Sequence, residues 1–412
     1  MEDHALEASS SSSVMMSKIQ FAALFCCSLV IWTVGNGLIP LLPVYVGRLG
    51  ASASVIGYSL SVIYLALATG TILAGWLSDR FQRRKLFFIM SGLGAALALW
   101  LVGRTVNIWV ATSLFAVAWF LGGMGLSLLS ILTGLFAPSG KRGRIFGLLA
   151  STGGLGALTG FAFGPIADLY GYSGMFALVA IFSISAPLAG FLLKDAARET
   201  RRKLSVNRHV GASVMLLLVA STLAGIASFV GLLGRSLVMN QVGFNSAAIS
   251  STSAIGGAVT LPLPFLFGAL SDRVGRKRLL ALCFAMAIIG MLALAVSSLI
   301  WHFWVAYSFL TVLSASSGVG YAFVTDLTPR KYLGTNISLY GATTWLGGIV
   351  GFAIAGILMQ IVGSSFTFLL GALLLLVALF LLMGIRQNVY PLGEFLNSTL
   401  HKRVCSYSGF EF

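Results

Sequence analysis

The sequence predicts an all-α integral membrane protein whose twelve transmembrane helices form two pseudo-symmetric six-helix bundles. Hydrophobic residues make up 58% of the 412-residue chain and charged residues only 9%, which is more apolar surface than a soluble protein of this length can bury. Apolar runs long enough to cross a bilayer follow one another along the chain. A short charged sequence occurs twice, at 75–85 and at 268–278, so that its copies are 193 residues apart.

Twelve apolar runs reach the length of about twenty residues that a helix needs to cross a bilayer. They lack the alternation of polar and apolar residues that is typical of the strands of membrane β-barrels. The expected spans are 19–46, 53–77, 86–103, 106–134, 145–169, 174–193, 210–238, 246–270, 279–298, 301–325, 335–361 and 365–385.

The basic residues orient these spans. If the N-terminus lies in the cytoplasm, all but three of the 26 lysines and arginines fall in cytoplasmic segments, and the exceptions are Arg48, Arg104 and Arg235. Cytoplasmic loops are enriched in Lys and Arg, so this split predicts that both termini are cytoplasmic. The net charge of +15 is therefore explained by membrane topology, and we expect no nucleic-acid partner.

The longest polar internal segment divides the chain into two halves. We expect a disordered cytoplasmic tail at 1–17, a first bundle at 18–193, a cytoplasmic linker at 194–209, a second bundle at 210–385 and a cytoplasmic tail at 386–412. The acidic, serine-rich start does not read as a signal peptide. Two parallel six-span halves are related by an axis along the membrane normal, and a cavity between them can open to either side.

The repeated charged sequence falls between the second and third spans of each half. Its two copies share Gly75, Asp79 and Arg80 in the first half with Gly268, Asp272 and Arg273 in the second, and each copy continues into a basic run that contains Arg84 or Arg276. Excess positive charge on the cytoplasmic side explains the arginines. It does not explain why the order Gly-x-Leu-Ser-Asp-Arg occurs twice.

This sequence resembles the signature loop of the major facilitator superfamily of secondary transporters, and the resemblance covers nearly the whole chain. It implies the twelve-helix fold and a small-molecule substrate that is moved by rocking of the two halves. It also implies that Asp79 helps to close the cytoplasmic side with Arg80 and Arg84 as partners. Gln82 stands where the family has a glycine, so we expect a looser turn there than at Gly275.

The fifth span contains a row of small residues that ends in a proline, formed by Gly156, Gly160, Gly164 and Pro165. Glycines four residues apart lie on one face of a helix and let another backbone approach closely. The row resembles the Gly-Pro motif in the fifth span of many exporters of the family, although Ala167-Asp168 follows where Gly-Gly often stands. The alternative is helix packing with no bearing on the direction of transport.

Few ionisable residues are placed at membrane depth, where burial is costly and function is the default interpretation. Asp168, near the outer end of span five, and Asp326, near the inner end of span ten, are candidates for coupling, with an interfacial structural role as the alternative for both. Arg235 in span seven either faces the cavity as an anion-binding or gating cation or extends its long side chain to the interface. The cavity-facing spans show no carboxylate or histidine of the kind that a standard proton relay uses.

Polar and aromatic residues in spans one, four, seven and ten are candidates for lining the cavity. These residues are Asn36, Trp119, Asn240, Tyr307 and Tyr321. Walls of mixed apolar and aromatic character suit a hydrophobic or amphipathic substrate.

The sequence thus predicts a secondary active transporter, and export of hydrophobic or amphipathic compounds, as in multidrug exporters, is the leading interpretation. The alternative is uptake or facilitated transport of a small metabolite, an anionic one if Arg235 takes part. We expect no enzymatic activity, no cofactor and no metal site, because neither a nucleotide-binding loop nor a clustered catalytic constellation occurs. A monomer in the lipid bilayer of the plasma membrane, with a proton as the candidate coupling ion, completes the prediction.

Overall fold

The computed structural model describes residues 17–136, 142–195, 210–329 and 332–385, and all the regular structure within these ranges is helical. The expected tails at 1–16 and 386–412, and the linker from 196 on, lie outside the described residues. The first half contains α2 (Lys18–Leu38), α3 (Leu42–Arg48), α4 (Ala53–Phe81), α5 (Arg84–Val102), α6 (Ile108–Phe136), α7 (Arg142–Gly160), α8 (Phe163–Ser183) and α9 (Ser185–Gly190).

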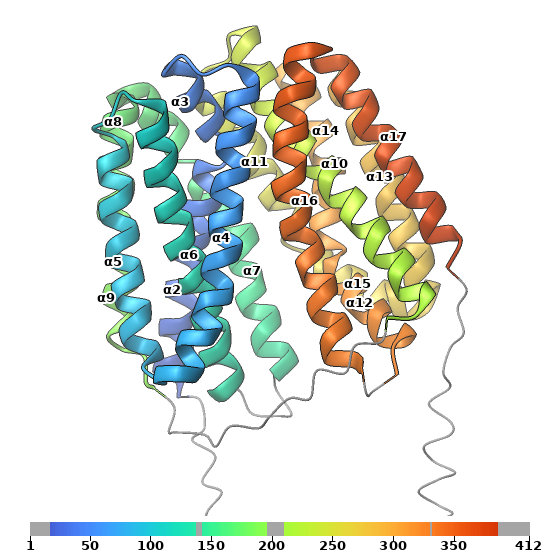
Figure 1. Cartoon of the computed structure of the whole chain (residues 1–412), viewed down its shortest axis with the longest axis horizontal. Helices are drawn as coiled ribbons and strands as arrows, with labels where there is room; N and C mark the ends of the chain where they lie inside the picture. Colours follow the sequence, from blue (N-terminus) through green and yellow to red (C-terminus); the bar gives the residue numbers. More distant parts are fainter. Residues whose placement is uncertain (1–16, 137–141, 196–209, 330–331, 386–412) are drawn as a thin grey trace, which may run out of the picture.

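The second half repeats this succession with a different set of breaks. It contains α10 (Ala212–Val242), α11 (Ser246–Thr260), α12 (Leu263–Val274), α13 (Arg276–Ala295), α14 (Ile300–Ala315), α15 (Ser317–Leu327), α16 (Leu333–Ile361) and α17 (Ser364–Met383). The two halves stand side by side as bundles of upright helices (Figure 1).

Several spans are broken helices, which is why there are more helices than spans. By length and composition, ten helical segments can cross a membrane, and eleven if α11 and α12, bent by 42°, count as one span. One of the ten, Phe163–Gly190, is itself interrupted at Gly171, whose φ of 69° and ψ of 171° lie outside the helical region. The residues before Gly171 continue α7, and those after it run back with α9. Counted in this way, the helices supply twelve spans.

The ends of the described ranges all lie at one side of the molecule. The first residue of α2, the end of α9, the start of α10 and the end of α17 lie at the same side, which we call the terminal side, and we call the opposite one the far side (Figure 1). Large apolar side chains such as Leu97, Ile181 and Phe380 are more than half exposed around the bundles. This exposure is expected for helices that face lipid, which satisfies apolar side chains without burial in protein.

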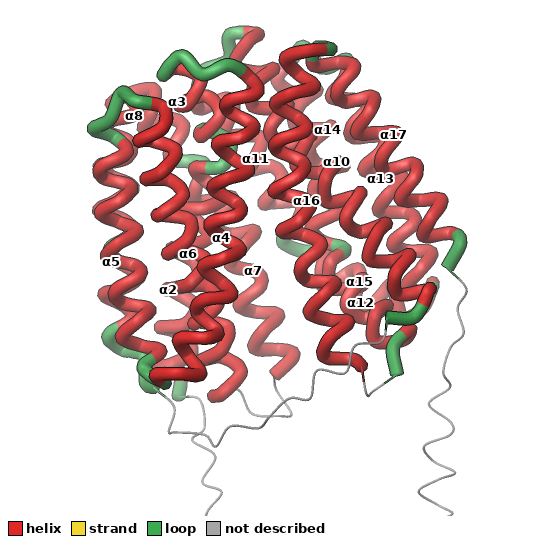
Figure 2. Tube along the Cα trace, in the orientation of Figure 1, coloured by secondary structure: helices red, strands yellow, loops and turns green. Residues whose placement is uncertain are grey.

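The two halves meet in two places. Helix α4 packs against α16, and α11 packs against α7 and α8, while the other large contacts stay within a half. Figure 2 shows α4 and α16 side by side at the far side, with the bundles spread apart toward the terminal side. These two contacts, which we call the far-side seam, hold the halves together. Toward the terminal side the halves are separated by an open space.

Candidate transport cavity and its gates

A cavity of about 1450 Å³ lies between the halves and takes its walls from both of them. Its lining begins at mid-depth, with residues such as Tyr64 and Trp119, and reaches Gly147 and Ser338 near the first turns of α7 and α16 on the terminal side. None of the described residues that line it is Asp, Glu, Lys, Arg or His. The cavity is therefore open toward the terminal side and has uncharged, largely apolar and aromatic walls.

Four of the five residues expected to line the cavity do so: Asn36, Trp119, Tyr307 and Tyr321. The Nδ2 of Asn36 donates a hydrogen bond of 2.9 Å to the carbonyl oxygen of Gly153, which ties α2 to α7 beside the cavity. Asn240 is not among the lining residues; it is exposed in the last turn of α10, at the far side. The expectation that Asn240 faces the cavity is wrong, because α10 continues past the cavity before it ends at Val242.

The glycine row of the fifth span packs in two directions. A Cβ on Gly156 or Gly160 would lie 2.6 Å from the backbone of α2, at Trp32 and Gly37 respectively. A Cβ on Gly164 would instead collide with Ser250 of α11, in the other half. The row therefore serves packing within the first half and, at its far-side end, the seam between the halves.

Pro165 affects a hydrogen bond that links this row to the seam. Because proline has no amide hydrogen, the carbonyl oxygen of Phe161, four residues earlier, loses its usual helical partner. The hydroxyl of Ser250 donates to that oxygen at 3.2 Å. The carbonyl oxygen of Phe161 therefore accepts from the amide of Gly164 in its own half, at 3.1 Å, and also from a side chain of the other half.

Asp168 makes the most specific contact of the seam. Its Oδ1 accepts a hydrogen bond from the backbone amide of Ser246 at 3.0 Å, and its Oδ2 accepts one from that of Ala247 at 2.8 Å. Both amides belong to the first turn of α11, where amides lack helical partners and the helix dipole favours a negative charge. Both oxygens of this carboxylate therefore cap the same helix, α11, of the opposite half.

An aromatic cluster that sequence analysis did not identify closes the far end of the cavity. The ring of Tyr64 in α4 lies 5.0 Å from that of Phe229 in α10 and 4.9 Å from that of Phe352 in α16, centroid to centroid. Nearby, the hydroxyl of Ser61 donates to the carbonyl oxygen of Ile349 at 2.7 Å. The spacing of Gly348, Phe352 and Gly356, each four residues apart, was the signal that could have placed them on one face.

The first signature loop lies at the terminal side and differs from what the resemblance implied. Arg84 is buried, and its Nε donates to the hydroxyl of Ser78 at 2.7 Å. Asp79 and Arg80 are exposed, and neither takes part in the two ion pairs found among the described residues. Arg84 therefore bonds to the serine that precedes Asp79 and not to Asp79 itself.

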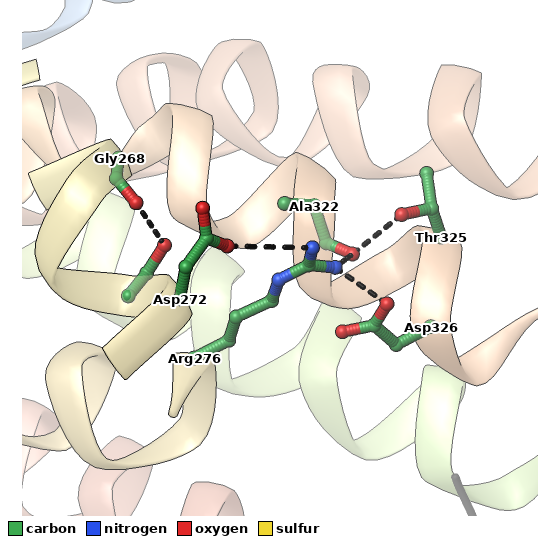
Figure 3. Close-up of polar contacts among 7 residues, drawn as sticks. Gly268, Asp272, Arg276, Ala322, Thr325 and Asp326 are labelled. Carbon is green, nitrogen blue, oxygen red and sulfur yellow. Dashed lines mark hydrogen bonds and ion pairs between the residues drawn. The ribbon is translucent and has the colours of Figure 1, made fainter. Parts of the chain in front are cut away.

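The second signature loop carries a compact ionic network. One guanidinium nitrogen of Arg276 lies 2.5 Å from Oδ1 of Asp326 and also donates to the carbonyl oxygen of Ala322, while the other lies 4.0 Å from Oδ1 of Asp272 (Figure 3). Arg273 points to solvent. Asp326 thus forms its ion pair within its own half, joining α15 to α13. The matching position in the first half is Thr133, a buried residue that bonds to its own helix.

The turns of the two loops have different lengths. Two residues separate α4 from α5, and Gln82 among them has a left-handed φ of 54°, whereas Gly275 alone separates α12 from α13, at φ 97° and ψ 137°. Only glycine adopts the latter conformation readily. The extra residue of the first loop aligns Arg84 with Arg276, each the first residue of its helix.

A lysine of each loop ties the third span of its half to the last one. The Nζ of Lys85 donates to the carbonyl oxygen of Phe191 at 2.6 Å, and that of Lys277 donates to those of Met383 and Ile385 at 2.7 and 2.8 Å. A cation near the carbonyl end of a helix is favoured by the helix dipole. Sequence analysis assigned these lysines to membrane topology alone, because the acceptors are more than a hundred residues away.

Arg235 is buried completely in α10, so the expectation that its side chain reaches the interface is wrong. Its guanidinium carbon lies 3.7 Å from the ring centroid of Tyr307, and one terminal nitrogen is 3.4 Å from the hydroxyl of Ser253. Arg235 does not line the cavity itself, but both of these partners do. A desolvated cation–π contact contributes about 2 kcal/mol, whereas an arginine in a membrane span costs about 2.5–3.5 kcal/mol on insertion scales.

Known proteins share this arrangement and parts of this sequence. The sequence model of the Major Facilitator Superfamily matches residues 24–232 and 214–399. The multidrug resistance protein MdtG of Salmonella arizonae is 28% identical over 286 residues, which cover 64% of this chain and 70% of that protein. MdtG of Salmonella paratyphi A is 29% identical over the same length.

Solved structures show the same fold at low identity. A bacterial homologue of the human lysosomal transporter Spinster, in an inward-facing and occupied conformation, superimposes with a TM-score of 0.72 at 15% identity and covers 88% of this chain and 95% of its own. The nucleoside transporter NupG does so with a TM-score of 0.69 at 13% identity over 90% of this chain and 99% of its own. The family model spans both halves of this helical fold, so the chain belongs to the Major Facilitator Superfamily of membrane transporters.

Proposed function

We propose that the protein is a secondary active transporter that exports hydrophobic or amphipathic compounds by alternating access. The observation that carries the proposal is the cavity of about 1450 Å³ between the halves, which is open toward the terminal side and closed on the far side by contacts between the halves. A substrate that enters from the terminal side has no path onward until the far-side seam separates. Rocking of the two halves about the cavity supplies that path.

The orientation of the protein follows from its charges. The signature loops, with Arg80, Lys85, Arg273 and Lys277, lie at the terminal side, and basic loops are retained in the cytoplasm. The terminal side is then the cytoplasmic side of a plasma membrane, with both termini inside, and the structure corresponds to an inward-open state. In this state Asp79 is exposed and available to close the cytoplasmic side when the halves rock.

Export is favoured by the walls of the cavity and by the relatives. The described residues of the walls are apolar, aromatic or uncharged polar, which suits hydrophobic molecules that enter from the membrane. MdtG, at 28–29% identity, is named as a multidrug resistance protein. The second candidate, uptake or facilitated movement of a small anionic metabolite, is favoured by one observation, the buried cation Arg235 beside the cavity.

A proton is the proposed coupling ion, and Asp168 is its proposed carrier. This carboxylate is exposed at the far side and caps α11 with both oxygens, so its protonation would remove a charge from the contact that keeps the far side shut.

We propose that the protein acts as a monomer, because the cavity and both gates lie within one chain.

Inverted membrane vesicles provide the test of this function. We expect dyes to accumulate in vesicles that contain the protein when a proton gradient, acidic inside, is imposed, and we expect collapse of the gradient to abolish accumulation. The dyes should include neutral, cationic and anionic members of similar size. Asp79→Asn should impair transport, because it removes the charge assigned to closure of the cytoplasmic side. If no dye moves in either direction, export of such compounds is excluded and uptake of a metabolite takes its place.

A further inference from the structure

Arg235 is the fully buried cation of the described part of the chain, and no carboxylate there balances it. Its side chain has 0% exposure, and neither of the two ion pairs among the described residues involves it. Its Nε and one terminal nitrogen have no hydrogen-bond partner, and the other terminal nitrogen has one long contact of 3.4 Å to Ser253. A buried charge in this condition is expected to have a counterion in some functional state.

The position of Arg235 directs its charge toward the cavity. Leu232, one turn earlier in α10, lines the cavity, as do Ser253 and Tyr307, the two side chains that the guanidinium touches. The ring of Tyr307, which forms part of the cavity wall, packs against the cation, with 3.7 Å from the guanidinium carbon to the ring centroid. The far end of the cavity is therefore one side chain away from an unbalanced positive charge.

The described residues of the cavity walls offer no other charge to a ligand at this end. Since no charged side chain occurs among the described residues that line the walls, no charge on these walls opposes that of Arg235 at this end. Near the aromatic cluster of Tyr64, Phe229 and Phe352, the walls offer apolar surface for the remainder of a ligand. An anion with an apolar body meets both conditions, whereas a cation is repelled.

We propose that Arg235, acting through Tyr307 and Ser253, makes the far end of the cavity a binding site for the anionic group of an amphipathic organic anion. The inference rests on the proposed function in that the site belongs to the transport cavity, and it narrows the substrate class. The anionic group, a carboxylate for example, binds at the hydroxyls of Tyr307 and Ser253, and Arg235 behind them supplies the balancing charge. The first half has no equivalent, since the pseudo-symmetric position is Leu42.

Three probes that share a pyrene body test the proposal: pyrenebutyrate, pyrenebutanol and a pyrenebutyl trimethylammonium salt. Binding to the purified full-length protein is measured by energy transfer from its tryptophans, of which Trp119 lines the cavity. We expect the anion to bind at least tenfold more tightly than the cation. In Arg235→Met the ratio of affinities for the anionic and neutral probes should fall about tenfold, and in Arg235→Lys it should fall less.

Leu42→Met is the matched control, because it places the same side chain at the pseudo-symmetric position and should leave the ratio unchanged. If Arg235→Met does not yield folded protein, Arg235→Gln keeps hydrogen-bonding capacity without the charge and is expected to show the same fall. Equal ratios in wild type and in a folded neutral variant would overturn the proposal.

Transport of the neutral probe in vesicles separates this proposal from the proposed function. If pyrenebutanol is transported but the anion preference does not depend on Arg235, the anion site is refuted and the exporter stands. If no probe is transported but the preference depends on Arg235, the site stands and the export function fails.

Discussion

The two ends of the contact between α4 and α16 differ sharply in packing. At the far end, a Cβ on Gly57 would lie 2.8 Å from the Cα of Gly356, and that approach is possible because neither residue has a side chain. At the terminal end of the same helices, a Cβ on Gly75 or Gly334 would meet no neighbouring atom within 4 Å among the described residues. Glycines that pack closely at one end are matched by glycines without neighbours at the other.

The second signature loop repeats this difference. Gly268 of α12 has no neighbour within 4 Å of its Cβ position in the described residues, while Gly164 and Gly257, at the seam of α7 and α8 with α11, are in close contact with the other half. We infer that the open glycines are the packing surface of the opposite state, in which the terminal side is closed. The comparison teaches that small residues mark both gates and that the conformation decides which set is in contact.

The largest expected effect comes from enlarging one glycine at each end of this contact. Gly57→Leu cannot be accommodated against Gly356 and should open the far side, whereas Gly75→Leu fits the present state and should prevent closure of the terminal side. Both variants should lose at least about 90% of transport, because overpacking of this kind costs about 1–3 kcal/mol or more. Their cavities, however, should be exposed to opposite sides of the membrane.

The reaction of an impermeant thiol reagent with Ser228→Cys, which lines the cavity, measures this exposure in a background without the native cysteines. Right-side-out vesicles should show faster labelling with Gly57→Leu, and inverted vesicles should show it with Gly75→Leu. The same labelling pattern in both variants would contradict the assignment of these glycines to opposite gates.

An intermediate effect is expected at Asp168. Asp168→Asn replaces a charged acceptor of two amide hydrogen bonds by a neutral group, and loss of a charged helix cap costs about 1 kcal/mol. The population with an open far side should rise about fivefold, which the labelling of Ser228→Cys in right-side-out vesicles reports. Asp195→Asn is the control, because this acid lies at the terminal side, bonds to Lys85 within its own half and should not change the labelling.

The smallest effect is expected from the network at the second signature loop. Asp326→Asn weakens the 2.5 Å pair with Arg276, whose side chains are 44% and 26% exposed, so thermal unfolding should show a loss of about 0.5–1 kcal/mol. Since both residues belong to one half, the side from which Ser228→Cys is labelled should not change. Asp272→Asn, with a 4.0 Å contact and 73% exposure, should have a still smaller effect. A shift in labelling would show that this network also belongs to a gate.

Much of the architecture was predictable because membrane helices leave strong local signals. The apolar runs placed twelve spans, and the repeated signature loop identified the pseudo-symmetry. Breaks within the spans were less visible. Neither the interruption of the tenth span at Ser316 nor the bend between α11 and α12 was predicted, although small and polar residues surround Ser316 and Pro262 lies at the bend.

The candidate site was predictable only in part. Asn36, Trp119, Tyr307 and Tyr321 were placed on the cavity by their spans, since the pseudo-symmetry assigns which helices line it. The bonds that Asp168 makes to Ser246 and Ala247, across 78 and 79 residues of chain, have no local signal. Arg235 was noticed as an anomaly, but whether its long side chain reached an interface or stayed buried could not be deduced from its place in an apolar run.

The sequence by itself determined the fold class, the number of spans and the location of the signature loops, because apolar length and repeated motifs depend on short stretches of chain. The tertiary structure alone decided which side of the cavity is closed and which partners Asp168, Arg84 and Arg235 have. Those contacts depend on how two six-helix halves meet, and this arrangement is fixed by the packing of small residues across the seam. Local sequence specifies each helix, whereas the gates exist only between helices.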